Sequence, residues 1–204
     1  LTTSGTSALM MATLALGIGP GKKVICTDMT WIATINPSLI CGAKIYLVDT
    51  LPNSQKVCFS KLNNLIKKIR PDLVILVHLS GEIVYDRKFN YLKKKIGFHV
   101  IEDAAQSFLV KDHEHKYCGT KYDIGCFSLS ITKLVNMVYG GFCVTNSDTF
   151  AKKLISISDV LVENYASGVI ERIGLGYEDI KKDNPNLIMV SSSGLGHSGP
   201  DKDH

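Results

Sequence analysis

The sequence predicts an α/β fold, a mainly parallel sheet with helices on both faces, because short β-branched runs alternate with helical segments over residues 1–155. Helical connections join parallel strands, and the helices then cover both faces of the sheet. The composition agrees, since 204 residues with 45% hydrophobic and 21% charged side chains are typical of a globular protein with a buried core. These values exclude a disordered tail, a collagen-like repeat and a disulfide-stabilised miniprotein.

The expected strands are short runs in which valine, isoleucine and other apolar residues predominate. Their apolar character indicates strands buried between helices rather than strands with one face in water. The predicted strands cover residues 23–27, 44–48, 73–78, 99–102, 124–130 and 141–145.

The helix predicted over residues 59–70 is the most regular, because its apolar residues recur with a period of about 3.6 and share one face. Pro71 ends this helix, since proline cannot continue it. The glycine-rich segment over residues 17–21 ends the first helix. The predicted helices cover residues 6–16, 31–41, 59–70, 85–95 and 147–157.

The sequence changes character near residue 159, and we therefore predict two parts, residues 1–156 and residues 157–204. The second part is expected to form an incomplete βαβ appendage, too small to bury both of its faces alone. Its predicted elements are a strand over 159–163, helices over 168–173 and 177–182, a strand over 187–191 and a glycine-rich loop over 191–200.

Charge and hydropathy narrow the range of partners. The net charge of +4 is mild, and the run Lys93–Lys95 is typical of a solvated helix face, so we expect no nucleic-acid partner. No apolar stretch approaches the roughly 20 residues of a membrane-spanning helix, so no membrane partner is expected. A signal-peptide pattern is also missing, and the chain begins at Leu1 inside an apparent motif, which suggests a fragment.

The six cysteines form no CxxC pair, and most lie in apolar runs. This pattern predicts buried free thiols and a reducing, cytoplasmic location. His113 and His115 could supply half of a metal site, but no further ligand has suitable spacing, so we expect no metal.

The residues Thr3-Ser4-Gly5-Thr6-Ser7 open the first predicted helix. Their hydroxyl and backbone N–H groups, together with the positive end of the helix dipole, can bind an anion such as phosphate. The alternative is an ordinary helix N-cap, for which serine and threonine are also preferred.

Two ionisable residues follow predicted strands. Asp103 comes at the end of a strand, where open parallel sheets bind ligands; a carboxylate there can hold a protonated ring nitrogen, although a helix N-cap is the alternative. Lys133 follows a strand among apolar and hydroxyl residues, where desolvation favours a nucleophilic amine, although a surface lysine is the alternative. Pyridoxal phosphate carries the three groups that such an acid, amine and anion site would bind.

Residues 2–154 resemble the sugar aminotransferases of the DegT/StrS type, which are pyridoxal-phosphate enzymes of fold type I. The resemblance rests on the order and spacing of several stretches. They are TSGTSALMMATLALGIGPGKKVI, TWIAT, AKIYLVD, EDAAQS, GTKYDIGCFSLSITK and GGFCVTN.

The resemblance implies a role for each matching residue. Lys133 would hold the cofactor covalently and move the proton between substrate and cofactor, and Asp103 would pair with the ring nitrogen. Gln106 would lie at the ring hydroxyl, and Trp31 would stack on the ring, with a core aromatic as the alternative. The residues implied to hold the phosphate are Thr6, Ser7 and Ser128.

The same resemblance implies a homodimer that transfers an amino group, typically from glutamate, to a keto sugar linked to a nucleotide. Two segments depart from the family pattern: His78-Leu79-Ser80-Gly81-Glu82, and the bulky stretch over residues 134–139. These departures concern the loop shape and the sugar specificity rather than the cofactor.

Residues 159–204 resemble a stretch of the class III coenzyme A transferases of the CaiB/BaiF type, a group that includes acyl-CoA racemases. The matching stretches are DVLVEN, ERIGLGYEDIK, NPNLI and SGLGHSGP. Coenzyme A would be the ligand under this alternative, whereas Asp201 and Asp203 match no catalytic motif. A third interpretation is an inactive chimeric fragment of both ancestries.

Overall fold

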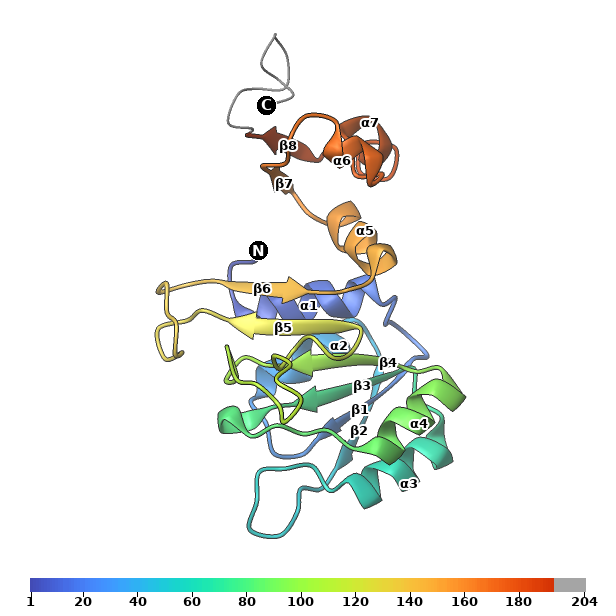
Figure 1. Cartoon of the computed structure of the whole chain (residues 1–204). Coiled ribbons are helices and arrows are strands. Elements are labelled where there is room, and N and C mark those ends of the chain that lie inside the picture. Colours follow the sequence, from blue (N-terminus) through green and yellow to red (C-terminus); the bar gives the residue numbers. More distant parts are fainter. Residues whose placement is uncertain (193–204) are drawn as a thin grey trace. The chain divides into compact units, whose positions relative to one another are not determined.

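The computed structural model describes residues 1–192. The chain divides into two compact units, Leu1–Ser147 and the segment that begins at Asp148 (Figure 1). Among the described residues, no helix is long and apolar enough to cross a membrane.

The first unit is built on a six-stranded sheet with the order β2-β1-β3-β4-β5-β6. The strands β1 to β5 are parallel, and β6 is antiparallel to β5, which confirms the predicted mainly parallel α/β fold. The strands are β1 (Lys23–Thr27), β2 (Lys44–Val48), β3 (Leu73–Val77), β4 (His99–Asp103), β5 (Ile124–Ser128) and β6 (Gly141–Val144).

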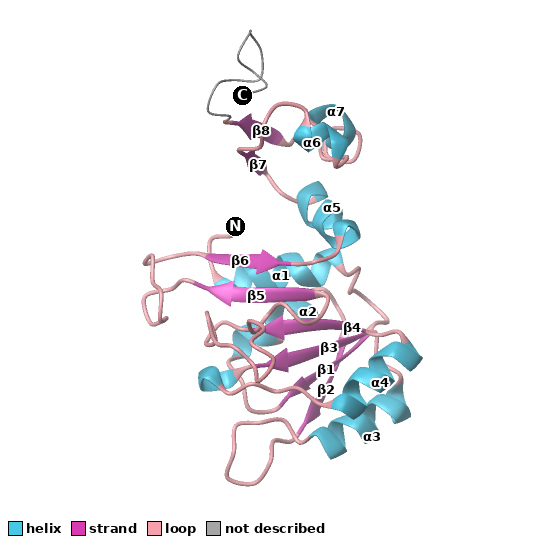
Figure 2. Ribbon diagram, viewed as in Figure 1, coloured by secondary structure: helices cyan, strands magenta, loops and turns pink. Residues whose placement is uncertain are grey.

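Helices cover both faces of this sheet (Figure 2). One face carries α1 (Gly5–Ala15), which contacts β5, β6 and α2 (Asn36–Ile40). The opposite face carries α3 (Phe59–Ile69) and α4 (Arg87–Ile96), whose apolar stripes pack on alternate residues of β1, β3 and β4. The core residues that α3 and α4 contribute are Leu62, Ile66, Phe89 and Leu92.

The single helix predicted over residues 31–41 is wrong. The segment instead forms a short 3-10 helix, η1 (Ile32–Thr34), and then α2, whose first turn contains Pro37. Proline is tolerated only in the first turn of a helix, because it lacks an N–H and its ring clashes with the preceding turn. The helical segment is therefore interrupted before Pro37. A second 3-10 turn, η2 (Leu79–Gly81), follows β3.

The second unit begins with α5 (Asp148–Ser156), which contacts α7 (Tyr177–Ile180). Its strands β7 (Val160–Glu163) and β8 (Ile188–Ser191) pair in parallel, with α6 (Val169–Arg172) and α7 between them in sequence. The unit thus starts one helix earlier than the boundary predicted at residues 156/157. The predicted loop over 191–200 lies outside the described residues from position 193 onward.

Candidate active site

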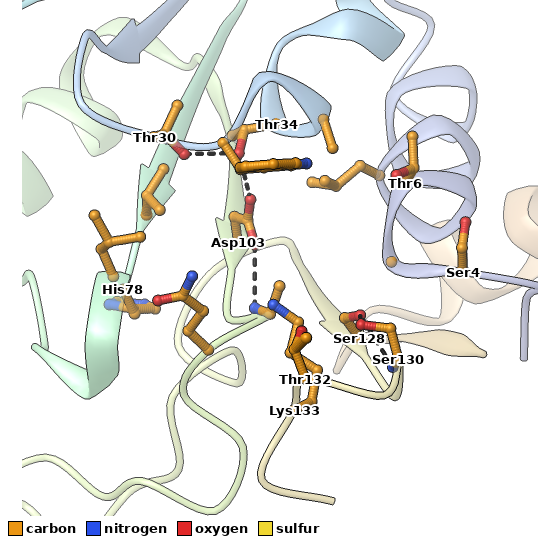
Figure 3. Close-up of a pocket in the computed structure, with 18 residues that line it drawn as sticks. Ser4, Thr6, Thr30, Thr34, His78, Asp103, Ser128, Ser130, Thr132 and Lys133 are labelled. Atoms are coloured by element: carbon orange, nitrogen blue, oxygen red, sulfur yellow. Dashed lines mark hydrogen bonds between the residues drawn. The ribbon is translucent and has the colours of Figure 1, made fainter. Parts of the chain in front are cut away.

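A cavity of about 490 Å³ lies at the carboxyl ends of the parallel strands in the first unit (Figure 3). Its lining comes from the segments that follow β1, β3, β4 and β5 and from the first turn of α1. Carboxyl ends of open parallel sheets are where ligands bind, because the connecting loops diverge there. The cavity lining includes six of the seven predicted site residues: Thr6, Trp31, Asp103, Gln106, Ser128 and Lys133.

Asp103 is the last residue of β4, and its carboxylate lies in the wall of the cavity with only 5% of the residue exposed. Thr34 donates a hydrogen bond to Oδ2 at 2.7 Å, and the Ala105 N–H donates to Oδ1 at 3.1 Å. Burial raises the pKa of Asp103, although the hydrogen bond from Thr34 partly opposes this effect. A buried carboxylate of this kind is poised for a cationic partner in the cavity.

The neighbouring Glu102 points away from the cavity into the core and is fully buried. Its Oε2 accepts hydrogen bonds from His78 Nε2 at 3.0 Å, the Tyr85 hydroxyl at 2.8 Å and the Gly119 N–H at 3.0 Å. Its Oε1 accepts from the backbone N–H groups of Lys121 and Tyr122, both at 2.8 Å. Five donors therefore satisfy this carboxylate, which fixes the chain around the end of β4.

His78 follows β3 and lines the cavity, although it is fully buried. Its Nδ1 accepts a hydrogen bond from the Val84 N–H at 3.2 Å, so the ring proton lies on Nε2 and is donated to Glu102. These two hydrogen bonds tie the segment after β3 to Glu102 near the end of β4.

The first turn of α1 faces the cavity with Ser4, Gly5 and Thr6. Ser4 is the N-cap, because its Oγ accepts a hydrogen bond from the Ser7 N–H at 3.1 Å. The Ser7 hydroxyl lies 3.0 Å from Ser4 Oγ and 3.0 Å from Thr3 Oγ1, and Ser7 is not among the lining residues. Ser4, rather than Ser7, thus brings its side chain to the cavity.

Gly5 allows α1 to approach β5 closely. A Cβ built on Gly5 would lie 2.7 Å from Ser128 Cβ, a separation that folded proteins do not tolerate without movement. The glycine therefore brings the positive end of the α1 dipole against Ser128, the last residue of β5.

We expect Gly5→Ala to lower the free energy of unfolding by about 1–3 kcal/mol, because the new methyl group overpacks this contact. Gly19→Ala is the matched control, since its Cβ would meet only the Cys41 carbonyl oxygen, at 3.6 Å. Urea unfolding followed by circular dichroism measures both variants. Equal stability of the two would show that α1 can move away from β5 without penalty.

The segment after β5 carries Ser130, Thr132 and Lys133, all of which line the cavity. Ser128 Oγ accepts a hydrogen bond from the Ser130 N–H at 3.4 Å, which turns the chain at the strand end. Lys133 is half-buried, and its Nζ has no hydrogen bond or ion pair with any of the described residues. Its positive charge acts on Asp103 and opposes the rise in the pKa of that carboxyl.

Trp31 and Gln106 line the cavity from the segments after β1 and β4. Trp31 is 74% exposed, so the alternative of a core aromatic residue is wrong. Gln106 is exposed, and its Oε1 accepts a hydrogen bond from the Ser80 N–H at 2.9 Å, which leaves its amide nitrogen as the free donor.

Six polar residues line the cavity in addition to the predicted site residues: Ser4, Thr30, Thr34, His78, Ser130 and Thr132. Ser4 had a recognisable signal, because serine before a helical run is a preferred N-cap. Thr34 had no such sequence signal, because only the fold brings it to Asp103, 69 positions further along the chain.

The donor set fits pyridoxal phosphate. Asp103 offers a buried carboxylate for a ring nitrogen, and Lys133 offers an amine, without a polar partner among residues 1–192, for an aldehyde carbon (Figure 3). Ser4, Thr6 and Ser128 lie together at the α1 terminus, where N–H groups and hydroxyls can bind a phosphate (Figure 3). The fold and the cavity together define a core of the pyridoxal-phosphate-dependent aminotransferase type.

A family model described as the DegT/DnrJ/EryC1/StrS aminotransferase family matches residues 1–178. The chain therefore belongs to this family, whose aminotransferases use pyridoxal phosphate. The match extends past residue 159, into the segment for which a coenzyme A transferase origin was predicted, and the comparisons offer no support for that origin.

Two curated relatives illustrate the similarity. GDP-perosamine synthase of Caulobacter vibrioides is 35% identical over 151 residues, which cover 74% of this chain and 40% of that protein. UDP-2-acetamido-2-deoxy-3-oxo-D-glucuronate aminotransferase of Pseudomonas aeruginosa is 33% identical over 156 residues, which cover 76% of this chain and 43% of that protein. The chain thus spans less than half the length of these relatives.

A solved structure is similar to this chain over a comparable part of its length. NtdA from Bacillus subtilis, described with bound cofactor PMP, is 29% identical with a TM-score of 0.68. The similarity covers 77% of this chain and 35% of that protein.

Proposed function

We propose that this chain forms the cofactor-binding core of a pyridoxal-phosphate-dependent aminotransferase that acts on a nucleotide-linked keto sugar. The observation that carries the proposal is the convergence of Asp103, Lys133 and the α1 N-terminus on one cavity. Three smaller cavities lined by the described residues lack this combination of a buried carboxylate, an amine and the N-terminus of a long helix.

Bound pyridoxal phosphate would supply an electron sink for the carbon from which the proton is removed. Asp103 would keep the ring nitrogen protonated, because a buried carboxylate stabilises an adjacent positive charge. Lys133 Nζ would hold the cofactor and then serve as the base that removes and returns the proton. Ser4, Thr6 and Ser128 would position the phosphate, Trp31 would cover the ring, and Gln106 would donate its amide hydrogen to the ring hydroxyl.

The substrate class is proposed from the relatives. The name of the Pseudomonas aeruginosa protein specifies a UDP-linked 3-oxo sugar acid, and that of the Caulobacter vibrioides protein specifies GDP-perosamine. A nucleotide-linked keto sugar as amino acceptor, glutamate as donor, a homodimer and a cytoplasmic location remain proposals for this chain. Coenzyme A binding by the second unit would favour the alternative of a class III coenzyme A transferase. A folded chain that binds neither pyridoxal phosphate nor coenzyme A would favour the alternative of an inactive fragment.

Capture of the cofactor on Lys133 tests the proposal directly. Pyridoxal phosphate is added to the full chain, the visible absorbance of the lysine adduct is recorded, and borohydride then fixes the pyridoxyl group. After trypsin digestion, we expect the modification in a peptide that spans residues 122–152, because trypsin does not cut after modified Lys133. A folded chain with no adduct on Lys133 would refute the proposal.

We expect Asp103→Asn to weaken pyridoxal-phosphate binding by about 10- to 100-fold, since a charge-assisted hydrogen bond to the ring nitrogen is lost. The cofactor-free variant should be at least as stable as the parent at pH values above the folded pKa of Asp103, where the parent buries a charged carboxylate. Because the pKa of Asp103 is raised by folding, the folded state holds this proton more tightly, and stability falls as pH rises from about 4 through the folded pKa.

Asparagine does not titrate, so the variant should lack that part of the pH dependence. Cofactor titration and urea unfolding across pH 4–8 measure the two effects separately. Unchanged cofactor affinity in a folded variant would contradict the role of Asp103.

A further inference from the structure

Two thiols on neighbouring strands form a cluster that the proposed reaction does not use. Cys126 on β5 lies directly opposite Cys143 on β6, and their Sγ atoms are 4.0 Å apart. Both thiols face α1, where the carbonyl oxygen of Ala8 lies 3.6 Å from the Cys126 Sγ and 3.1 Å from the Cys143 Sγ and can accept a hydrogen bond from either. The two side chains are therefore held side by side on the α1 face of the sheet.

The adjacent pair supports this register. The rings of Phe127 and Phe142, which project to the opposite face, stack with their centroids 4.6 Å apart and their planes 8° from parallel. The two strands pair residue against residue over this stretch, without a bulge. The Cys126–Cys143 pair therefore shares a regular antiparallel register.

Directly opposed residues of an antiparallel pair have Cα atoms about 4.5–5.5 Å apart. A disulfide bond commonly joins residues whose Cα atoms are about 4.4–6.8 Å apart, so the backbone of this pair already satisfies that requirement. Side-chain rotation alone can then bring the sulfur atoms into bonding distance. We propose that Cys126 and Cys143 are a disulfide-forming pair that a peroxide oxidises.

Cys143 is the first thiol to react, because it is only partly buried, whereas Cys126 is 1% exposed. The hydrogen bond from Cys126 also lowers the pKa of Cys143, while burial raises the pKa of Cys126. The Cys143 thiolate attacks one oxygen of hydrogen peroxide, the O–O bond breaks, and the departing hydroxide is protonated to water.

The second step closes the disulfide. Cys143 is now a sulfenic acid, and the Cys126 sulfur attacks it as the Cys126 thiol loses its proton. The S–O bond breaks, and its oxygen leaves as a second water molecule. Two thiols are thus oxidised to one disulfide, and one peroxide is reduced to two waters.

The disulfide would close a ring over residues 126–143, which contains Ser128 and Lys133. Closing this ring reduces the freedom of the unfolded chain, so oxidation should raise the urea midpoint of unfolding. Reduction with dithiothreitol should return the midpoint to its starting value.

Peptide mapping of the full chain tests the proposal. The folded chain is treated with hydrogen peroxide, free thiols are blocked with iodoacetamide, and trypsin is added without reductant. Trypsin cuts after Lys121, Lys133 and Lys152, so the two cysteines fall in separate peptides, residues 122–133 and 134–152. We expect these two peptides to be linked, with a mass two hydrogens below their sum.

Cys126→Ser and Cys143→Ser should each abolish the linked peptide, whereas the control Cys41→Ser should retain it. Sulfinic acid on Cys143 without any linked peptide in the folded parent would overturn the proposal, as would preferential linkage of either residue to another cysteine. The mapping of the parent chain decides the question even if a serine variant fails to fold.

Discussion

Lys133→Ala should abolish covalent capture of pyridoxal phosphate and reduce amino transfer at least about 10³-fold, because no other lysine among the described residues lines the cavity to replace the lost nucleophile and base. Lys133 Nζ has no polar partner among the described residues, so its removal should leave the fold intact. Asp103 and the α1 terminus remain, and the variant should still bind the cofactor reversibly. The measurements are borohydride trapping with mass spectrometry and retention of cofactor on gel filtration.

Lys88→Ala provides the matched control, since Lys88 is an exposed residue of α4 outside the cavity lining. This control should capture the cofactor as the parent does. Trapping on another lysine in Lys133→Ala, at the parent level, would mean that the reactive amine has been misassigned. Loss of trapping together with loss of circular-dichroism signal would instead identify a folding defect.

Glu102→Gln should lower the free energy of unfolding by about 3–5 kcal/mol, the usual range for removal of one partner from a buried charged network. In either orientation of the glutamine amide, its NH₂ group would face backbone N–H donors: Lys121 and Tyr122 on one side, or Gly119 on the other. Donors facing donors in the core leave hydrogen bonds unmade. Urea unfolding followed by circular dichroism measures the loss.

The pH dependence separates the charge from the packing. Burial alone would raise the pKa of Glu102, but the hydrogen bonds from His78 and Tyr85 outweigh it, and the pKa is lowered. The stabilisation is therefore complete above the unfolded pKa of about 4.3 and is lost as pH falls through the folded pKa. The difference between the parent and Glu102→Gln should shrink below pH 4.

Glu114→Gln is the control for this second experiment. Glu114 forms ion pairs with His113 and Lys116, but its side chain is 50% exposed, so the change should cost less than about 1 kcal/mol. A cost for Glu102→Gln no larger than this would show that the buried network contributes little to stability.

Periodicity located the elements of the sheet well, because each buried strand is short and flanked by polar or glycine residues. The bounds of β1 and β2 coincide with the predicted runs. Periodicity could not show that β6 pairs antiparallel to β5, because pairing direction depends on how the intervening connection folds. The break before Pro37, by contrast, was available from the chemistry of proline.

The candidate site was predictable where a residue type carries a chemical role, as with Asp103 and Lys133. Their roles in this chain remain predictions until cofactor capture is measured. Partners that only the fold brings together were beyond sequence reasoning. The buried network of Glu102 joins the segments after β3, β4 and η2, and nothing in the local sequence distinguishes this acid from its neighbour. Ser4 lines the cavity and Ser7 does not, because the N-cap residue, rather than the third helical residue, lies at the cavity end of α1.

The strand order β2-β1-β3 makes substitutions at the two ends of the sheet differ in their effect on the cavity. β2 and β3 lie on opposite sides of β1, so the chain changes direction across the sheet after β2. The connections that leave the carboxyl ends of neighbouring strands therefore run apart at this point. Substitutions in the carboxyl-end connections, such as η1 and the segment after β3, therefore change the lining of the cavity directly. The amino-end connections, tied by the Lys22–Asp72 ion pair at 2.9 Å, do not line the cavity, so substitutions there act on stability rather than on the cavity lining.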